Sequence, residues 1–265
     1  MLSRIFKSAI KRGLVAGNAV QLVDRPKVRR KERRVLTPAE IGRTLHAFGE
    51  LIEEATDARR QDLELTRMAF ALMIDTGIRK AEAFGLRWGS VALADPAGPR
   101  IRIEQTFVRN QKDMPKSDAG RRTIEISETV AGMLMDFRAV TAYKADGATV
   151  LCNPRTGHPY FDSVVYKSLL QEAFKRAEIE GTEEIGPCHD LRRTSLTSGA
   201  AAGAAPIALQ ARAGHSSFAT TRRYLMLAGV GFEEETAKHS ERLWGASKRD
   251  VKVAGGSSPN RPPAQ

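Results

Sequence analysis

Two arginines, two histidines, a lysine and a tyrosine are spaced along the chain so that they could converge on one phosphate group. Guanidinium and imidazole groups stabilise the charge that develops on phosphate oxygens in a transition state. A tyrosine hydroxyl can serve as a covalent nucleophile, and a lysine ammonium can protonate a leaving oxygen. Such a set meets the needs of phosphodiester transfer without a metal ion. The six residues are Arg79, Lys116, His189, Arg192, His215 and Tyr224.

Arg79 follows a break at Gly77 and begins a predicted helix. A guanidinium at a helix N-terminus adds its charge to the positive end of the helix dipole, and together they suit a phosphate. Glu82 lies three residues further on and can hold Arg79 from the same helix face. Taken alone, the pair could equally be a surface ion pair.

His189 and Arg192 are three positions apart, so they share a helix face and could bind one anion. The alternative is a buried structural histidine beside a surface arginine. Cys188 next to His189 could suggest a thiol nucleophile or a metal ligand. Neighbouring residues do not face each other on a helix, and no further ligand cluster appears, so both readings are weak.

The remaining three candidates are each ambiguous when taken singly. Lys116 lies in a polar turn, where it could reach into a groove as a proton donor or be only solvated. His215 follows Gly214, and Tyr224 comes nine residues later. A tyrosine at that position could simply pack with its hydroxyl satisfied. The combination of all six residues is far more specific than any one of them.

Composition narrows the function further. The 265-residue chain has a formal net charge of +11 and two cysteines, which excludes a disulfide framework and an all-cysteine zinc site. Residues 1–35 hold eleven Lys/Arg against two acidic residues, so the excess charge is concentrated there. This pattern suggests a polyanionic partner. Nothing resembles the clustered carboxylates of a two-metal nuclease, which argues against metal-dependent hydrolysis. No apolar run is long enough to cross a membrane.

The elements that must position these residues read as a mainly α-helical α+β domain with a small antiparallel sheet. Thr37, Pro38 and Glu40 combine an N-cap, a proline at the first helical position and a capping-box glutamate, so we expect a domain boundary near residue 35. Alternating residues predict strands at 100–104 and 123–126, and a third at 149–151. Helices are predicted at 3–16, 38–55, 61–76, 79–88, 128–141, 162–179, 190–203, 206–213, 217–225 and 232–245.

The sequence resembles the tyrosine recombinases of the phage integrase family over about residues 37–246. The first arginine box of that family matches residues 76–83 and 86–88. Its hairpin lysine matches Lys116, and its His-x-x-Arg box matches residues 189–192. Its second-histidine box matches residues 214–217, and its nucleophile matches Tyr224.

The resemblance implies the integrase catalytic fold and site-specific DNA recombination. Tyr224 would attack the scissile phosphate and form a 3′-phosphotyrosyl link, with Glu82 in a supporting role and with no cofactor, metal or ATP. The implied partner is double-stranded DNA at attachment-type sites, bound by a homotetramer with possible DNA-bending accessory proteins. The implied setting is the bacterial cytoplasm, at the nucleoid, on a mobile genetic element. A type IB topoisomerase uses similar groups but would not show this second-histidine box.

One departure from the family concerns the N-terminal part. Residues 1–20 resemble only the last helix of a core-binding domain, followed by a basic linker at 21–35, the catalytic domain at 36–246 and a disordered tail at 247–265. We therefore expect full activity to be limited by a truncated clamp on DNA. A second hypothesis stays open, in which the chain is a DNA-binding or oligomerising remnant of an integrase without recombination activity of its own.

Overall fold

The computed structural model of the protein describes residues 2–23, 34–108, 111–113, 121–159, 163–183, 185–186 and 188–229. For residues 108, 111–113 and 163 only the backbone is described. The chain divides into two compact units, one within residues 1–33 and one that begins at Arg34. The predicted helix at 232–245 and the predicted tail at 247–265 lie outside the described residues, as does most of the predicted linker.

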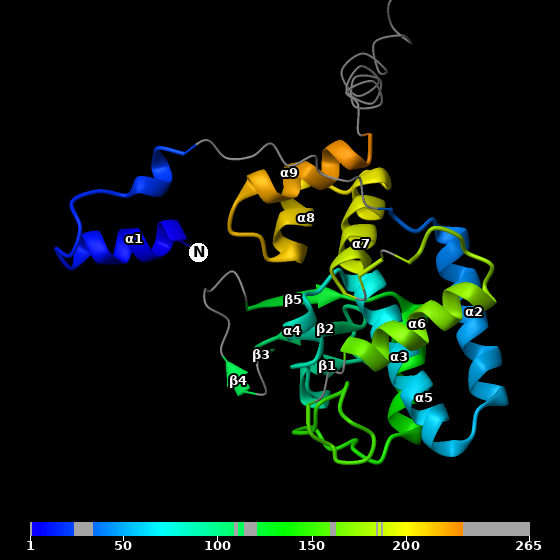
Figure 1. The fold of residues 1–265 in the computed structure, drawn as a ribbon. Coiled ribbons are helices and arrows are strands. Elements are labelled where there is room, and N and C mark those ends of the chain that lie inside the picture. Colours follow the sequence, from blue (N-terminus) through cyan, green and yellow to red (C-terminus); the bar gives the residue numbers. More distant parts are fainter. Residues whose placement is uncertain are drawn as a thin grey trace, which may run out of the picture. The chain divides into compact units, whose positions relative to one another are not determined.

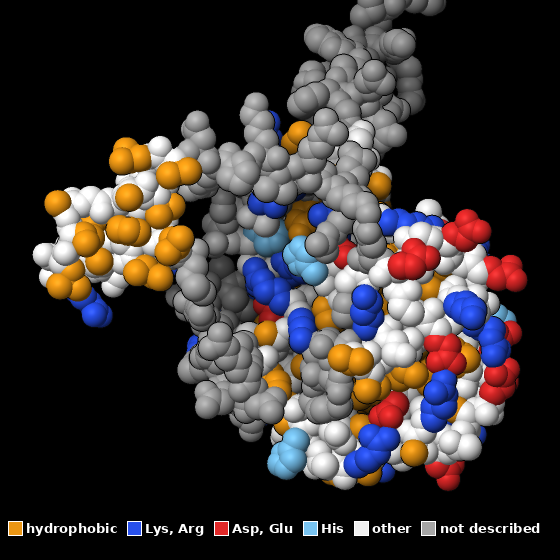
Figure 2. Space-filling model, viewed as in Figure 1, with side chains coloured by type: hydrophobic (Ala, Val, Ile, Leu, Met, Phe, Trp, Pro, Cys, Tyr) orange, Lys and Arg blue, Asp and Glu red, His pale blue; other side chains and the backbone are white. Residues whose placement is uncertain are grey.

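The N-terminal unit consists of helix α1 (Leu2–Lys11) and a short 3₁₀ helix, η1 (Ala19–Gln21). Helix α1 ends earlier than the predicted residue 16, because Gly13 has a φ of 69° and the Leu14 N–H bonds back to the Ala9 carbonyl at 2.9 Å. This is the left-handed turn with which many helices stop. No side chain of α1 is buried, and hydrophobic side chains are prominent on this unit in Figure 2.

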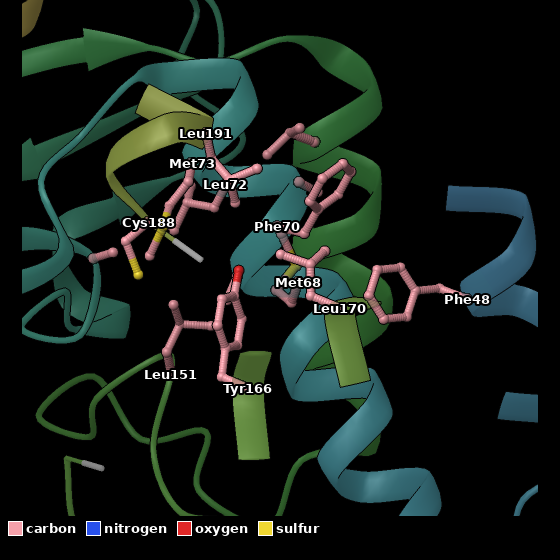
Figure 3. Packing of buried hydrophobic residues seen from close by; sticks show 14 of the residues in the cluster. Phe48, Met68, Phe70, Leu72, Met73, Leu151, Tyr166, Leu170, Cys188 and Leu191 are labelled. Carbon is pink, nitrogen blue, oxygen red and sulfur yellow. The ribbon is translucent and has the colours of Figure 1, made fainter. Parts of the chain in front are cut away.

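The second unit is built around helix α3 (Asp57–Thr76), which contacts helices α2 (Pro38–Glu54), α5 (Glu128–Val140) and α6 (Ser163–Arg176). The predicted capping box at the start of α2 is present, with Thr37 and Glu40 bonded reciprocally. Figure 3 shows side chains of α2, α3 and α6 in the core, among them Phe48, Phe70 and Leu170. Phe70 of α3 packs between Phe48 and Phe174, with ring centroids 6.1 and 6.4 Å away. Burial of such large apolar surfaces is the main force holding the helices together.

An antiparallel sheet of strands β1 (Val91–Ala92), β2 (Arg100–Ile103) and β5 (Arg122–Glu125) lies against the helices in that order. Ile101 pairs with Ile124, and both are buried while their chain neighbours are not. This alternation is the one that predicted the two strands. The sequence did not predict a second hairpin, formed by β3 (Thr106–Val108) and β4 (Gln111–Asp113).

Two further predicted elements differ from the structure. The predicted helix at 79–88 is only the four-residue α4 (Lys80–Ala83), followed by a 3₁₀ turn, η2 (Trp88–Ser90). Glycine favours a helix interior less than most residues, and Gly85 follows the end of α4. Its lack of a side chain lets the chain before β3 pass close by, since a Cβ there would lie 3.1 Å from the Gln105 carbonyl oxygen. The predicted strand at 149–151 is also wrong, since Thr149 makes only a single bridge to Arg87.

Helices α7 (His189–Ala201), α8 (Pro206–Ala213) and α9 (Phe218–Leu227) form the last part of the described chain and agree closely with their predicted positions. They enclose a small second core of Leu196, Ala200, Leu209 and Ala213. Helix α7 also packs on α3, and α8 contacts β5. Figure 1 shows α7, α8 and α9 gathered beside the sheet. None of the described helices is long and apolar enough to span a membrane.

Candidate active site

A cavity of about 530 Å³ opens where the start of α4 meets α7, α8 and α9. It brings together five of the six residues that the sequence singled out for chemistry. Figure 2 shows basic side chains and histidines gathered in the region of α7, α8 and α9, whereas acidic side chains lie mainly on the side of α2. The cavity is lined by Arg79, Lys80, Ala81, Cys188, His189, Arg192, His215, Ser216, Thr220 and Tyr224.

Arg79 lies directly before α4 in an extended conformation, after α3 has ended at Gly77 with a φ of 65°. Its backbone N–H donates to Glu82 Oε2 at 2.8 Å, and its Nη1 donates to Glu82 Oε1 at 2.8 Å. Its Nη2 donates to the Gly214 carbonyl at 2.6 Å. The Arg79 side chain is 42% exposed, so the guanidinium is held in place while part of it faces the cavity.

Arg192 lies one turn into α7 and is buried. Its Nη1 donates to the Gly77 carbonyl, and its Nη2 donates to the Ala213 carbonyl at 2.9 Å. Burial, followed by the positive charge of Arg79, lowers the pKa of Arg192 to about 10. The guanidinium therefore stays charged at neutral pH. Because a buried charge is poorly solvated, the Arg192 guanidinium would pair favourably with an anion that enters the cavity.

His215 and Tyr224 are stacked face to face, with ring centroids 5.8 Å apart and planes 9° from parallel. His215 follows the left-handed C-cap of α8 at Gly214, and Tyr224 lies on α9. Burial and then the charges of nearby arginines, Arg192 first, lower the pKa of His215 to about 4. The imidazole is therefore neutral at pH 7.

His189 is the first residue of α7, is exposed and lines the cavity. Cys188 beside it is buried, and burial raises the pKa of its thiol to about 12, so it offers no thiolate at neutral pH. Lys116 lies outside the described residues. No group of three or more His, Cys, Asp or Glu side chains that could hold a metal ion occurs in the described part of the chain.

Arg122 on β5 is a member of the site that the sequence did not single out. Its Nη1 and Nη2 donate to the two carboxylate oxygens of Glu82, each at 2.9 Å. Glu82, which is not part of the cavity lining, thus binds both Arg79 and Arg122. The only sequence signal for Arg122 is its position six residues after Lys116, on the strand that leads away from the predicted lysine turn.

The end of α8 is where the arginines meet. Three consecutive carbonyl groups of residues 212–214 each accept a hydrogen bond from a different arginine. A helix C-terminus presents carbonyls without partners and the negative end of the dipole, so it attracts cations. Arg122 Nε donates to the carbonyl of residue 212 at 2.8 Å. Arg192 Nη2 donates to that of residue 213 at 2.9 Å, and Arg79 Nη2 to that of residue 214 at 2.6 Å.

Comparison with known proteins agrees with this geometry. Residues 34–229 match the model of the phage integrase family. The tyrosine recombinase XerC of Mycobacterium bovis and that of Mycobacterium tuberculosis are each 26% identical over 226 residues, which cover 83% of this chain and 67% of theirs.

Solved structures show the same fold. The integrase of transposon Tn1549, in complex with a circular intermediate DNA, superposes with a TM-score of 0.65 at 22% identity, over 91% of this chain and 76% of that one. A lambda integrase dimer bound to a core site superposes with a TM-score of 0.56 at 18% identity, over 84% and 56% of the two chains. At these identities the likeness establishes the fold. With the family match over most of its length, the chain belongs to the phage integrase family, the tyrosine-type site-specific DNA recombinases.

Proposed function

We propose that this chain cleaves and rejoins double-stranded DNA with Tyr224 as the nucleophile. The observation that carries the proposal is the common cavity, in which the Tyr224 ring is stacked on His215 and two arginines line the wall. Family membership favours this recombinase over an integrase remnant without activity. DNA as the partner is further supported by the DNA-bound state of the transposon and lambda integrases.

In the proposed first step the Tyr224 oxygen attacks the scissile phosphorus. A bond forms between this oxygen and phosphorus, and the bond to the 5′ oxygen breaks. Arg79, Arg192 and His189 stabilise the charge on the phosphate oxygens, and His215 acts through its contact with Arg192. The proton of the Tyr224 hydroxyl passes to water, and the leaving 5′ oxygen takes a proton from Lys116, which becomes neutral.

In the second step a 5′-hydroxyl of a partner duplex attacks the phosphotyrosine. The attacking hydroxyl returns a proton to Lys116, the bond from phosphorus to the Tyr224 oxygen breaks, and Tyr224 regains its proton from water. The phosphodiester is restored. Since the 3′-phosphotyrosyl link keeps the energy of the broken bond, the exchange consumes no further energy source.

We extend the proposal to the assembly and the setting. Residues 36–246 would be the catalytic domain, and four copies would act on two attachment-type duplexes, with DNA-bending proteins as possible accessories. The reaction would take place at the nucleoid in the bacterial cytoplasm. The support is the resemblance to the family. Cross-linking of the protein on a synthetic four-way junction tests the assembly, because a complex of fewer than four copies would contradict it.

Covalent trapping on a nicked suicide duplex tests the nucleophile. The wild-type protein should become linked to DNA, and Tyr224→Phe should lose the link while binding DNA with nearly unchanged affinity. Two other tyrosines are poor candidates, because Tyr143 donates its hydroxyl to the Arg155 carbonyl and burial raises the pKa of Tyr166 well above its usual value. A link that persists in Tyr224→Phe, or maps to Tyr143, Tyr160 or Tyr166, would contradict the assignment.

A further inference from the structure

Both ring nitrogens of His215 are engaged by buried groups. Nε2 lies 2.7 Å from Arg192 Nη2, and Nδ1 lies 3.0 Å from Thr221 Oγ1. The exposed fractions of the three residues are 9% for His215, 5% for Arg192 and 1% for Thr221. Water therefore has little access to these three side chains. The protonation of the two His215 ring nitrogens is determined by their protein partners.

Only one protonation state of the imidazole satisfies both contacts. An arginine side chain can donate hydrogen bonds but cannot accept them, so Nε2 must present its lone pair to Arg192. A neutral imidazole carries its proton on the other nitrogen in that case, and Nδ1–H then donates to the Thr221 hydroxyl. The opposite tautomer and the imidazolium would each set an N–H of His215 against an N–H of Arg192.

Thr221 lies on α9 three residues before Tyr224, so one helix supplies both the hydroxyl and the stacked ring that flank His215. Thr221 is absent from the cavity lining, whereas Thr220 is part of it. A group so placed acts on the reaction only through His215.

We propose that Thr221 is a positioning residue whose hydroxyl accepts from Nδ1–H and holds the His215 ring with Nε2 toward Arg192, the contact that sets the tautomer. The inference rests on the proposed function, since it assigns the residue that orders the phosphate-binding groups of that site. Arg192 Nη2 is committed to His215 and to the Ala213 carbonyl. Arg192 also lines the cavity, so a guanidinium fixed in this way is presented to the incoming phosphate.

The tautomer can be measured without DNA and without activity. Nitrogen-15 NMR of the full chain with labelled histidines separates the two ring nitrogens, and His215→Gln identifies the signal among the five histidines. Wild type and Thr221→Ser should show Nδ1 protonated and Nε2 unprotonated. Thr221→Val should keep this tautomer, because Arg192 still requires the Nε2 lone pair, but should shift the Nδ1 resonance, because Nδ1–H has lost its acceptor. A wild-type signal with Nε2 protonated would overturn the inference, whatever the variants do.

A matched control is Thr197→Val. Thr197 is a buried threonine on α7, and its Oγ1 has no hydrogen-bond partner within the described part of the chain. The same removal of a hydroxyl should leave the His215 signal as in wild type.

Single-turnover cleavage of the nicked duplex gives the second measurement. Thr221→Val should slow cleavage about tenfold, the scale on which one missing hydrogen bond acts, without changing the Kd for DNA. Thr221→Ser should restore the rate, and Thr197→Val should leave it unchanged. Equal rates in Thr221→Val and Thr197→Val, or a Thr221→Ser variant as slow as Thr221→Val, would contradict positioning by the hydroxyl. A wild-type protein that forms no covalent link, yet shows the expected tautomers, would defeat the proposed function and leave the tautomer assignment in place.

Discussion

Glu82 and Arg122 meet in a two-point ion pair that is shielded from solvent, with side chains exposed by 2% and 9%. Burial by itself raises the pKa of Glu82, but the hydrogen bonds and charge of Arg122, with those of Arg79, hold it below its usual value. The carboxylate is therefore charged at neutral pH. The Glu82 carboxylate links Arg79, which lines the cavity, to Arg122, which is not part of the cavity lining.

Arg122→Ala should lower the free energy of unfolding by up to about 3–5 kcal/mol, because the buried Glu82 carboxylate then keeps only its contacts with the partly exposed Arg79. Chemical denaturation measures the change. Arg155→Ala is the control, since its pair with Asp62 has an arginine that is 53% exposed and should contribute at most about 1 kcal/mol. A destabilisation in Arg122→Ala no larger than in this control would show that the buried pair is dispensable.

Alanine at Arg79 or Arg192 should each slow DNA cleavage by about 10²–10³-fold, the usual effect of removing one transition-state donor. Lysine at either position should rescue poorly, because an ammonium lacks the planar fork of donors. Single-turnover trapping on the suicide duplex measures both. Arg59→Ala, which breaks a surface pair with Glu172 away from the cavity, should cleave normally. Near-normal cleavage by a lysine variant would argue against direct phosphate contact.

Lys116→Ala should be rescued by a DNA substrate with sulfur in place of the bridging 5′ oxygen, because a thiolate leaves without needing a proton. Arg79→Ala should not be rescued, since its absence affects the non-bridging oxygens. Cleavage rates of both variants on both substrates decide the point. The same response in the two variants would remove Lys116 from the role of general acid.

The low pKa of His215 should make stability depend on pH. Its folded-state pKa of about 4 lies below the usual value of 6.5, so between these values the unfolded chain binds the proton and the folded chain does not. Stability contributed by the neutral ring is present above pH 6.5 and is lost as pH falls toward 4. The gap in unfolding free energy between wild type and His215→Gln should therefore narrow over that range. A gap that is constant from pH 7 to pH 4.5 would show an unshifted histidine.

The basic segment at residues 1–35 should bind DNA phosphates. Replacing Arg29 and Arg30 with glutamine should weaken DNA binding and flatten the slope of log affinity against log salt by about 0.9 for each phosphate that is no longer neutralised. Replacing Arg59 and Lys175 with glutamine is the matched control, because these residues lie on α3 and α6 and neither lines the cavity. Fluorescence anisotropy across a salt series measures the slopes. Identical slopes in the two double variants would exclude a DNA contact by the segment.

Much of the fold could be predicted because its signals are local. Thr37 with Glu40, and Ser127 bonded to the Val130 N–H, mark helix starts within a few residues of sequence. The hairpin of β3 and β4 carries no such signal, since its strands are short and do not alternate clearly between apolar and polar residues. The close approach of residues 105–107 to Gly85 is likewise a long-range contact that no local pattern reveals.

The residues of the candidate site were also predictable only in part. Chemistry-bearing residue types at characteristic spacings pointed to the five residues that the structure gathers around the cavity. Arg122 and Thr221 were missed because their roles depend on partners. Arg122 meets Glu82 across 40 residues of sequence, and Thr221 is an ordinary threonine until its hydroxyl is seen beside His215.

The three carbonyls at the end of α8 have a consequence for biosynthesis. Two of the arginines that they hold lie 135 and 90 residues earlier in the chain, and the third lies 21 residues earlier. Closing such long loops is slow compared with forming local helices. A growing chain that has not yet reached residue 214 lacks the acceptors that order its arginines. The capacity to cut DNA is therefore acquired only after α8 and α9 have left the ribosome.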